Sequence, residues 1–557
     1  MNFVGGIPME YNFKFLSSLE KVFFDLPQEI PELESGTMLK NEIYSFQLAG
    51  CISGYSIAKL MAKLTVESPL AEYITVKRVD YVPVTTPTIP SRSDEYYITK
   101  TPGMFPDPLQ KIYDGNIFIL DDQARSFWVT VEGKDLKPGK YPIHFKIEKA
   151  TGDQIVLCDK TFTLEILGAE LPPLDIYNTG WFHGDCIAAL HNVEIQSEEY
   201  LVLVRKYLDV YVKFGHNTLL TPIFTPPLDT VVGGERPTNQ LIDVWVENGQ
   251  YRFGFDKLKQ WLDVAHEAGV RYFEIAHLFT QWGAGHAPKI MATVDGEYKK
   301  IFGWETDALS DEYKGFMDAM LPQLVAFLKA EGVYDNCWFH ISDEPRPNHT
   351  EQYEASQKLV LPHIPREKLL DALSSYEFYE KGIVASPVVS ANHMRNFTDN
   401  GVLKQWVYYC GSQCSQSPNR FMAMPAYRNR ILGSQLYKYE TPGFLQWGYN
   451  FWFEQFSVGV VNPYADTCAA GSFPGGDSFL VYPVDKDGDV VLSTRLYVFN
   501  EGFQDLRAMK LLESLTDRKT VEALLVDLDG FDIYPRSNDY ILDLRAKVND
   551  LIREKIS

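Results

Sequence analysis

The spacing of hydrophobic residues changes near residue 170, and this change divides the chain into two parts. Before it, short β-rich runs such as YITVKRVDYVPV, RSFWVTVEG and GKYPIHFKIE are separated by Gly, Pro, Asp and Asn. Runs of this kind are typical of an antiparallel β-sandwich. The LPPLD segment at 171–175 has the composition of a linker. We therefore predict an N-terminal β-sandwich domain over residues 1–170 and a second domain over residues 171–557.

In the second part, strand-like apolar runs alternate with helical stretches, which is the pattern of parallel β/α units. Helical stretches such as SEEYLVLVRKYLDVYVKFG and FDKLKQWLDVAHEAG end at a glycine, as expected for a helix C-cap. The predicted strands cover residues 176–182, 217–224, 270–276, 337–342, 369–373, 383–389, 404–410 and 444–452. Eight such units in order predict a (β/α)8 TIM-type barrel with long βα loops and a C-terminal helical segment.

Enzymes with this barrel carry their chemistry in the loops that leave the C-terminal ends of the strands. In this chain those positions are aromatic, rich in amides and poor in lysine. Such a rim suits a neutral polyhydroxylated ligand, because aromatic faces stack on C–H groups while polar groups bind the hydroxyls. Loop burial or packing inside the barrel is the alternative explanation for each of these residues. The candidate substrate-binding residues are His277, Trp282, His286, Asn392, His393, Tyr408, Tyr409, Trp447 and Tyr449.

The overall charge restricts the class of partner. The chain has 52 Lys and Arg against 74 Asp and Glu, and its net charge of −22 argues against nucleic-acid binding and against anionic lipid. Its start has no basic stretch followed by an apolar one, and no segment offers roughly 18 uncharged apolar residues. The 7 scattered cysteines fit reduced thiols. We therefore expect a cytoplasmic protein without membrane insertion.

The sharpest chemical feature is a pair of adjacent carboxylates in WFHISDEPRPNH, where an apolar strand runs into Asp343, Glu344 and Pro345. Neighbouring side chains in a regular strand point to opposite faces. Since Pro345 ends the ladder, the backbone can turn so that both carboxylates reach the mouth of the barrel. A structural alternative exists, because acidic residues before a helix favour its dipole and Arg346 can neutralise one of them.

Two carboxylates this close can take different roles only if one stays ionised and the other holds a proton. Glycoside hydrolysis requires such a division. Most retaining and inverting enzymes take their two carboxylates from different strands, about 5 Å or more apart. Sequence neighbours fit the substrate-assisted variant better, in which the 2-acetamido oxygen of the sugar attacks the anomeric carbon.

At these residues the sequence resembles glycoside hydrolase family 123, whose members are retaining exo-acting N-acetyl-β-galactosaminidases. The resemblance covers most of the chain. It is carried by the Asp343-Glu344-Pro345 turn after WFHIS, by GFLQWGYNFW at 443–452, by GGDSFLVYP at 475–483 and by STRLYVFNEGFQDLRAMKLLE at 493–513.

The resemblance implies specific roles for the acidic pair and a specific substrate. Asp343 would orient the acetamido group and stabilise the developing oxazolinium, while Glu344 would act as general acid and then as general base. The implied substrate is a neutral glycan with terminal β-N-acetylgalactosamine, such as a glycosphingolipid oligosaccharide. Tyr408 or Tyr409 would donate its hydroxyl to the acetamido carbonyl.

Two other functions remain open from the sequence. The first is a catalytically inactive barrel that binds carbohydrate or serves as a scaffold. The second is a β-N-acetylglucosaminidase, because only the orientation of the C4 hydroxyl separates the two sugars and no residue shows which orientation is recognised.

The sequence favours no metal and no cofactor. His183-x-Asp185 has one histidine where metal-binding barrels usually carry two, and Cys410 and Cys414 lack a second pair at zinc-site spacing. The remaining candidates are better explained by structure. We expect His216 to be structural, Asp477 to serve a turn, and the residues Arg495, Glu501 and Asp505 to pack and form ion pairs.

Overall fold

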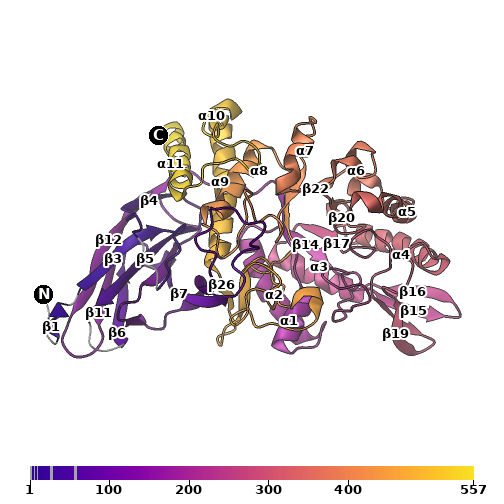
Figure 1. The fold of residues 1–557 in the computed structure, drawn as a ribbon, viewed down its shortest axis with the longest axis horizontal. Helices are drawn as coiled ribbons and strands as arrows, with labels where there is room; N and C mark the ends of the chain where they lie inside the picture. Colours follow the sequence, from indigo (N-terminus) through magenta and orange to yellow (C-terminus); the bar gives the residue numbers. More distant parts are fainter. Residues whose placement is uncertain (1–2, 5–6, 9, 25–28, 55–58, 557) are drawn as a thin grey trace.

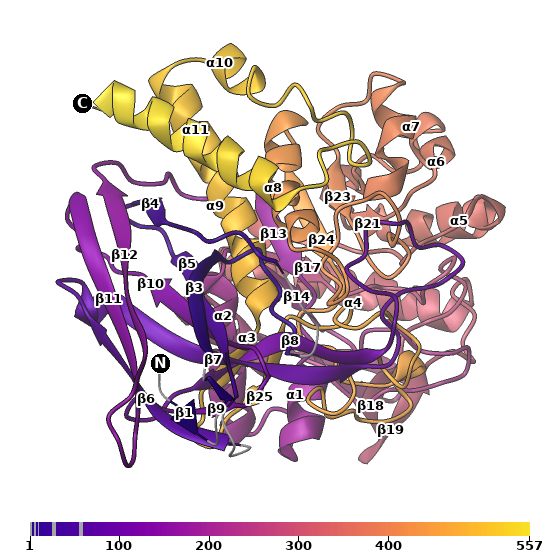
Figure 2. The same cartoon turned by 60° about the vertical axis from the view of Figure 1, so that its left-hand side comes forward.

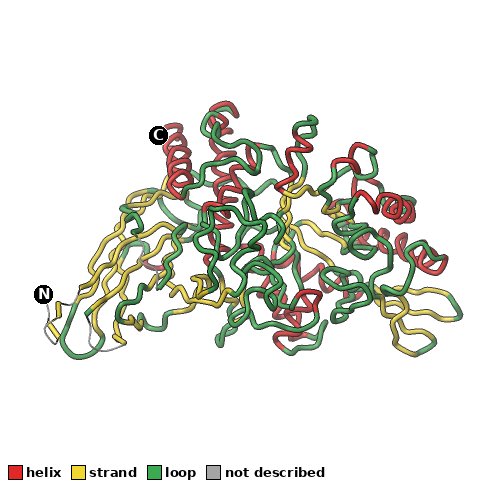
Figure 3. Tube along the Cα trace, viewed as in Figure 1, coloured by secondary structure: helices red, strands yellow, loops and turns green. Residues whose placement is uncertain are grey.

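A computed structural model describes residues 3–4, 7–8, 10–24, 29–54 and 59–556 of the protein. Residues 1–2, 5–6 and 9, in the region where no secretion signal is predicted, lie outside this range. The N-terminal sheets form one end of the molecule, and the helices with the remaining strands form the other (Figure 1). Figure 3 shows the same division, with strands dominating the N-terminal end.

The N-terminal part contains two five-stranded sheets, in the strand orders β3-β5-β10-β7-β8 and β4-β12-β11-β6-β9. Neighbouring strands are antiparallel except β4 and β12, which pair in parallel. The first sheet consists of β3 (Glu10–Ser17), β5 (Tyr44–Ser53), β10 (Arg125–Val131), β7 (Ile74–Val84) and β8 (Gly103–Lys111). The second consists of β4 (Ser35–Leu39), β12 (Val156–Leu167), β11 (Gly139–Lys149), β6 (Lys59–Glu67) and β9 (Asn116–Leu120).

Aromatic side chains fill the space between these two sheets. Phe46 of β5 and Phe162 of β12 stack with their ring centroids 4.1 Å apart, and Phe15 of β3 meets both rings edge-on. The alternation of buried and exposed residues along these strands explains why the antiparallel sheets were predictable. The predicted N-terminal antiparallel arrangement is confirmed. The boundary at residue 170 stays a prediction; β12 ends at Leu167.

The second part is built on eight parallel strands in the order β20-β17-β14-β13-β24-β23-β22-β21. Every one overlaps a strand predicted from the sequence. They are β13 (Tyr177–Gly180), β14 (Thr218–Thr221), β17 (Tyr272–Ile275), β20 (Cys337–Phe339), β21 (Asp371–Ala372), β22 (Pro387–Ser390), β23 (Trp406–Tyr408) and β24 (Gly443–Gln446). The strands follow one another in chain order around a curled sheet, as expected for β/α units.

The seam between β20 and β21 is the weakest pairing of this curled sheet. One parallel bridge joins Phe339 to Leu369, and the N–H of Leu370 donates to the Phe339 carbonyl at 2.9 Å. The Asp371 carboxylate accepts the N–H of Ile341 at 2.9 Å, so a side chain takes the place of a backbone acceptor. The sheet is therefore a curled, open half-barrel with one bridge at the seam, and a regularly closed barrel stays a prediction.

Helices cover the outside of the curled sheet. Gly269 adopts φ +98° at the C-cap of α3, as the sequence predicts for a helix end. None of the described helices is long and apolar enough to cross a membrane. The helices are α1 (Gly184–His191), α2 (Glu198–Lys213), α3 (Asp256–Ala268), α4 (Asp311–Ala330), α5 (Thr350–Val360), α6 (Tyr376–Glu380), α7 (Met394–Thr398), α8 (Tyr427–Lys438), α9 (Thr494–Leu515), α10 (Arg518–Glu522) and α11 (Asn538–Ile556).

Long insertions after β14 and β17 form a separate four-stranded sheet in the order β16-β15-β18-β19. It projects from the end of the molecule opposite the sandwich (Figure 1). Its strands are β15 (Asp243–Glu247), β16 (Gln250–Gly254), β18 (Ile290–Val294) and β19 (Glu297–Phe302). Two short pairs complete the described strands, β1 (Phe3–Val4) with β2 (Ile7–Pro8) and β25 (Val481–Val484) with β26 (Val490–Leu492).

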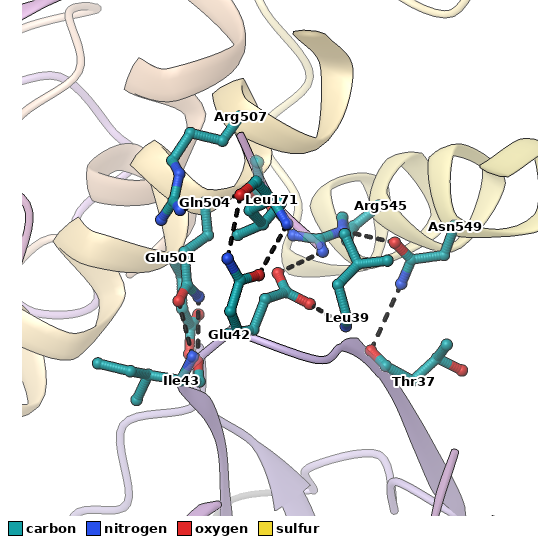
Figure 4. A network of polar contacts seen from close by, with 12 residues as sticks. Thr37, Leu39, Glu42, Ile43, Leu171, Glu501, Gln504, Arg507, Arg545 and Asn549 are labelled. Carbon is teal, nitrogen blue, oxygen red and sulfur yellow. Dashed lines mark hydrogen bonds and ion pairs between the residues drawn. The ribbon is translucent and has the colours of Figure 1, made fainter. Parts of the chain in front are cut away.

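A buried polar network fastens the sandwich to the C-terminal helices. Helix α11 runs from the helical part toward the edge of the sandwich near β4 (Figure 2). There Arg545 of α11 donates to Glu42 of the sandwich (Figure 4) and, at 2.9 Å, to Asp505 of α9. Gln504 exchanges two hydrogen bonds with the backbone of Ile43, at 2.8 and 3.0 Å.

Arg495, Glu501 and Asp505 of α9 form ion pairs, as predicted. Arg495 pairs with Asp107 of the sandwich at 2.9 Å, while Glu501 accepts from Arg430 of α8 at 2.8 Å. Asp505 also pairs with Arg430, at 2.7 Å. These contacts join α8 and α9 to the N-terminal sheets and so connect the two parts of the chain.

We predict that Arg545→Ala destabilises the whole protein. The variant leaves Glu42 buried without its cation and removes one of the two cations beside Asp505, and breaking a buried pair in this way costs about 3–5 kcal/mol. Denaturant unfolding measures the change. Lys555→Ala, in the exposed last turn of the same helix, is the matched control and should change the unfolding free energy by less than about 0.5 kcal/mol. Equal effects of the two variants would contradict the role of the network.

Candidate active site

The two adjacent carboxylates lie in a sharp turn just beyond β20. Glu344 adopts φ +45°, a left-handed conformation that is strained by about 1–3 kcal/mol for a residue other than glycine. This conformation breaks the strand alternation that would otherwise separate Asp343 from Glu344. The sequence attributed the turn to Pro345 alone, whereas in the structure the change of direction already begins at Glu344.

Three neighbouring segments hold this strained turn. The N–H of Glu344 donates to the carbonyl of Ala372 in β21 at 3.1 Å, and the hydroxyl of Tyr408 in β23 donates to Glu344 Oε1 at 2.6 Å. On the other side, the N–H of Trp282 donates to the Asp343 carbonyl at 2.8 Å. The turn is therefore fixed from the loops of three other strands.

The environment separates this pair from ordinary surface carboxylates. Burial, followed by the charge of Glu344, raises the pKa of Asp343 well above its usual range, and the positive charge of His340 opposes the rise. Asp343 therefore holds its proton more tightly than an exposed carboxylate would. This is the electrostatic condition that acid catalysis by one member of the pair requires.

A buried chain of hydrogen bonds lies beneath the acidic pair. His340 Nε2 is 2.9 Å from Glu274 Oε2, and His340 Nδ1 is 3.4 Å from Asp371 Oδ1. The same Glu274 oxygen accepts from the indole of Trp181 at 3.0 Å, and Asp371 Oδ2 accepts from the Tyr353 hydroxyl at 2.5 Å. None of these five residues is more than 3% exposed.

The charge state of His340 follows from this arrangement. Burial disfavours the imidazolium, but the hydrogen bonds to Asp371 and Glu274 and the charges of those carboxylates outweigh it and raise the pKa of His340 to about 9. His340 is therefore a buried cation at neutral pH, placed between two carboxylates and close to Asp343.

Sequence reasoning missed Glu274, His340 and Asp371. A usable signal was present, because each is the lone carboxylate or histidine inside a mostly apolar strand-like run, in YFEIA, WFHIS and LLDAL respectively. Since buried charges are tolerated only when paired, three such residues on successive strands predict a shared network.

His277 stacks on this network. Its ring lies 4.5 Å from that of His340 at 21° to it, and neither of its nitrogens has a hydrogen-bond partner among the described residues. Burial, and then the charge of His340, lowers the pKa of His277 well below its usual range. His277 is therefore neutral, and it lies below the mouth at 2% exposure.

The grouping of His277, His340 and Asp371 invites comparison with a metal site, since one ligand atom of each lies within 4.8 Å of the others. Histidine binds a metal through a lone pair in the plane of its ring, at about 2.0–2.1 Å for zinc. Two nearly parallel stacked rings cannot direct in-plane lone pairs at one ion. The arrangement of these side chains therefore fits a hydrogen-bonded ion network and does not fit a metal centre.

A cavity of about 430 Å³ opens beside Glu344, and two predicted binding residues, Tyr408 and His393, line it. His393 Nδ1 lies 2.7 Å from the Ser390 hydroxyl. Asn392 is exposed, and its amide oxygen accepts from Gln413 at 2.8 Å. The structure thus places residues from the ends of β20, β22 and β23 around a single opening.

Trp447 is half-buried at the end of β24, and Asp477 fixes its orientation. The indole N–H donates to Asp477 Oδ2 at 3.2 Å. Burial raises the pKa of Asp477 to about 7, although Arg420 and the indole N–H partly offset the rise. The sequence explained Asp477 by turn geometry alone. The structure adds that this carboxylate positions an aromatic candidate for ligand stacking.

The two remaining rim candidates come from the loop after β17. Trp282 is 38% exposed with φ +63°, and its backbone supports the acidic turn. His286 is half-buried with its ring 5.7 Å from that of Trp304. Direct contact of either side chain with a ligand stays a prediction.

Tyr449 and Tyr409 are both completely buried, and neither lines the cavity beside Glu344. Direct contact of either side chain with substrate stays a prediction. β24 ends at Gln446, so strand parity no longer applies at Tyr449, and its hydroxyl donates to the carbonyl of Tyr207 in α2 at 3.3 Å. Tyr409 follows Tyr408 on the opposite face of the β23 chain and packs against Phe444 at 4.9 Å.

Two histidines set aside by the sequence are structural. His183 lies between the Trp447 carbonyl, at 2.8 Å, and Arg236, while Arg236 forms a buried ion pair with Asp185 at 2.8 Å. The Asp185 carboxylate is therefore already ion-paired with the Arg236 guanidinium. His216 stacks on Tyr211 at 4.3 Å, and burial lowers its pKa to about 3.

Comparison with known proteins gives a sequence profile that extends over this region. The profile described as "Glycoside hydrolase 123, catalytic domain" matches residues 181–512, which is more than half of the 557 residues and includes the acidic pair. No curated protein sequence matches the chain.

Among solved structures, a family 123 glycoside hydrolase from Clostridium perfringens, studied for glycolipid glycan hydrolysis, is similar with a TM-score of 0.75 and 15% identity over 98% of this chain and 99% of that one. At this identity the likeness shows the fold alone. The N-terminal domain of PorA matches with a TM-score of only 0.15 and 8% identity, over 28% of this chain and 100% of that one, and carries no argument.

The buried imidazolium predicts how stability depends on pH. The pKa of His340 in the folded protein, about 9, exceeds the ordinary value of 6.5, so folding retains a proton that the unfolded chain releases. This contribution is fully present below pH 6.5 and is lost as pH rises to about 9, where the unfolding free energy should have fallen by on the order of 2–3 kcal/mol.

Denaturant unfolding of wild type and His340→Gln across this pH range measures the effect. The variant should lack this part of the pH dependence, whereas His363→Gln, at a half-buried histidine paired with Asp318, should keep it. A His340→Gln variant that follows the wild-type slope would contradict the assignment of a buried cation.

Proposed function

The chain belongs to the glycoside hydrolase 123 family, and on that basis we propose that this glycosidase is a retaining exo-enzyme that removes terminal β-linked N-acetylgalactosamine from glycans. The proposed reaction is substrate-assisted and passes through an oxazoline intermediate. The single observation that carries the proposal is the strained turn at Glu344, which supports two adjacent carboxylates at one mouth.

The position of the pair favours substrate assistance over the two common schemes. Both common schemes place a carboxylate on either side of the scissile bond, about 5 Å or more apart. Here Asp343 and Glu344 are consecutive and leave the same strand end, so they approach the sugar together. A nucleophile supplied by the substrate removes the need for an opposing carboxylate.

In the proposed first step, Asp343 orients the acetamido N–H so that its carbonyl oxygen attacks the anomeric carbon, while Glu344 gives its proton to the leaving oxygen. The bond to the leaving group breaks as the oxazoline ring closes. Positive charge develops on the acetamido group beside Asp343, which favours the ionised form of Asp343 and leaves the shared proton on Glu344. In the second step Glu344 takes a proton from a water molecule as the water oxygen bonds to the anomeric carbon. The bond from that carbon to the acetamido oxygen breaks, and the product forms with net retention.

Tyr408 supports this division of roles. Its hydroxyl donates to Glu344 Oε1 at 2.6 Å and lies 3.3 Å from the Ser374 hydroxyl. The bond directs the remaining Glu344 oxygen and so sets the position from which the proton is delivered.

The proposed natural substrates are neutral glycans such as those of glycosphingolipids. Aromatic side chains near the mouth, including the Trp447 ring fixed by Asp477, suit the apolar face of a sugar ring. The structural relative from Clostridium perfringens is described for glycolipid glycan hydrolysis, which supports the same substrate class here. The competing substrate is the epimeric β-N-acetylglucosaminide, which a nitrophenyl glycoside assay distinguishes.

We expect wild-type protein to release p-nitrophenol from the β-GalNAc glycoside and, more slowly or not at all, from the β-GlcNAc glycoside. Glu344→Gln should lower kcat/KM by about 10²–10⁴-fold. The loss should be larger for a disaccharide than for the nitrophenyl glycoside, because p-nitrophenolate departs without protonation whereas a sugar alkoxide does not.

Asp343→Asn should lose most of kcat while KM stays within a fewfold, because its charge matters chiefly on the way to the transition state. A proportional fall in rate and binding would reassign Asp343 to a ground-state contact. Failure of correctly folded wild type to cleave either nitrophenyl glycoside or a β-GalNAc disaccharide would contradict the proposed function.

Adjacent tyrosines in β23 provide a matched pair of variants. Tyr408→Phe removes the hydrogen bond to Glu344 and should lower kcat about 10- to 100-fold, because charge-assisted bonds contribute about 1.5–3 kcal/mol. Tyr409→Phe removes a hydroxyl that has no hydrogen-bond partner among the described residues, and should leave kcat unchanged. Steady-state kinetics of both variants test this; an equal loss in both would show that Tyr408 acts through packing of the strand.

A further inference from the structure

The cavity beside Glu344 lies on one side of the acidic pair. Its lining comes from the loops after β20, β21, β22 and β23, and the residues that line it include Glu344, Arg346, Tyr376, His393 and Asn396. Asp343 is not among the lining residues. Since the proposed function assigns Asp343 to the acetamido group of the cleaved sugar and Glu344 to the leaving oxygen, this cavity lies on the leaving-group side.

The residues that line the cavity are less acidic than the protein as a whole. Glu344 is the only carboxylate among the described residues that line it, although the chain as a whole carries 74 Asp and Glu against 52 Lys and Arg. Arg346 is the only Arg or Lys in the lining. It is exposed, and within the described part of the chain no carboxylate lies at ion-pair distance from its guanidinium.

Polar groups from the neighbouring loops line the same cavity as Arg346. His393 engages Ser390 through Nδ1, which leaves Nε2 without a partner among the described residues, and the amide of Asn396 is exposed in the same lining. The ring of Tyr376 adds an aromatic surface. At about 430 Å³ the cavity falls within the range of about 300–1,000 Å³ typical of small-molecule sites.

We propose that this cavity is a leaving-group subsite that recognises a carboxylate-bearing sugar attached next to the cleaved bond, with Arg346 as its anion-binding residue. A planar guanidinium binds a carboxylate through two parallel hydrogen bonds. An unpaired arginine in an otherwise acidic protein provides that partner where a leaving sugar must lie. His393 and Asn396 supply further donors for the hydroxyls of the acidic sugar.

This inference rests on the proposed function and is tested with three substrates that share a terminal β-GalNAc. They are the p-nitrophenyl glycoside, a neutral trisaccharide, and the same trisaccharide with an acidic sugar on the residue next to the cleaved bond. Arg346→Ala should lower kcat/KM for the acidic substrate about 10- to 100-fold and leave the other two within about twofold. Arg346→Gln should behave similarly, because it keeps a polar side chain but removes the charge.

Arg271→Ala is the matched control. Arg271 is an exposed arginine at the opposite, N-terminal end of β17, and its loss should affect none of the three substrates. An equal fall for all three substrates with Arg346→Ala would overturn the subsite and assign Arg346 to support of Glu344. No effect on the acidic substrate would overturn it as well.

A binding measurement separates this inference from the proposed function, because it needs no turnover. Calorimetry measures the affinity of the acidic oligosaccharide that would be released, together with its neutral counterpart. Arg346→Ala should raise the Kd of the acidic oligosaccharide by about 10-fold or more relative to wild type. The Kd of the neutral oligosaccharide should be the same for both proteins. A sulfated neutral oligosaccharide that binds as tightly as the acidic one would contradict the assignment to a carboxylate sugar.

Discussion

The left-handed turn at Glu344 is the constraint on which the catalytic arrangement depends. With φ +45° at Glu344, side chains no longer alternate between the two faces of a strand, and two consecutive carboxylates leave the same strand end. Such a conformation costs about 1–3 kcal/mol and persists only where its surroundings determine it. Bonds from the Trp282 and Glu344 amides and from the Tyr408 hydroxyl supply that support. The fold around the turn, including the β21 and β23 strand ends, is what holds it in place.

Charge balance in the interior is the second condition. The curled sheet carries Glu274 and Asp371 inside, and His340 lies between them as a cation. This cation also opposes the rise in the pKa of Asp343, which burial and Glu344 cause. The same principle operates at the join between the two parts of the chain, where Arg545 lies between Glu42 and Asp505. In both places carboxylates are buried because a cation accompanies them.

Much of this arrangement was predictable from sequence because the eight parallel strands are buried on both sides and therefore form apolar runs. Their order also follows from the chain, since each run is followed by a helical stretch. Strand parity carries no information where a strand stops: it placed Tyr449 beside Trp447, although β24 ends at Gln446 and Tyr449 contacts Tyr207 of α2. The ion network of Glu274, His340 and Asp371 went unnoticed because each residue stands alone in its strand and only the curled sheet brings them together.

In the proposed reaction the substrate supplies the nucleophile, and a series of p-nitrophenyl β-glycosides tests this step. The series carries acetamido, monofluoro-, difluoro- and trifluoroacetamido groups at C2, which reduce the nucleophilicity of the carbonyl oxygen stepwise with little change in shape. If the acetamido oxygen is the nucleophile, log kcat/KM falls steeply and steadily along the series. A rate that is unaffected by fluorination would contradict it, because a protein carboxylate or water would then be the attacking group.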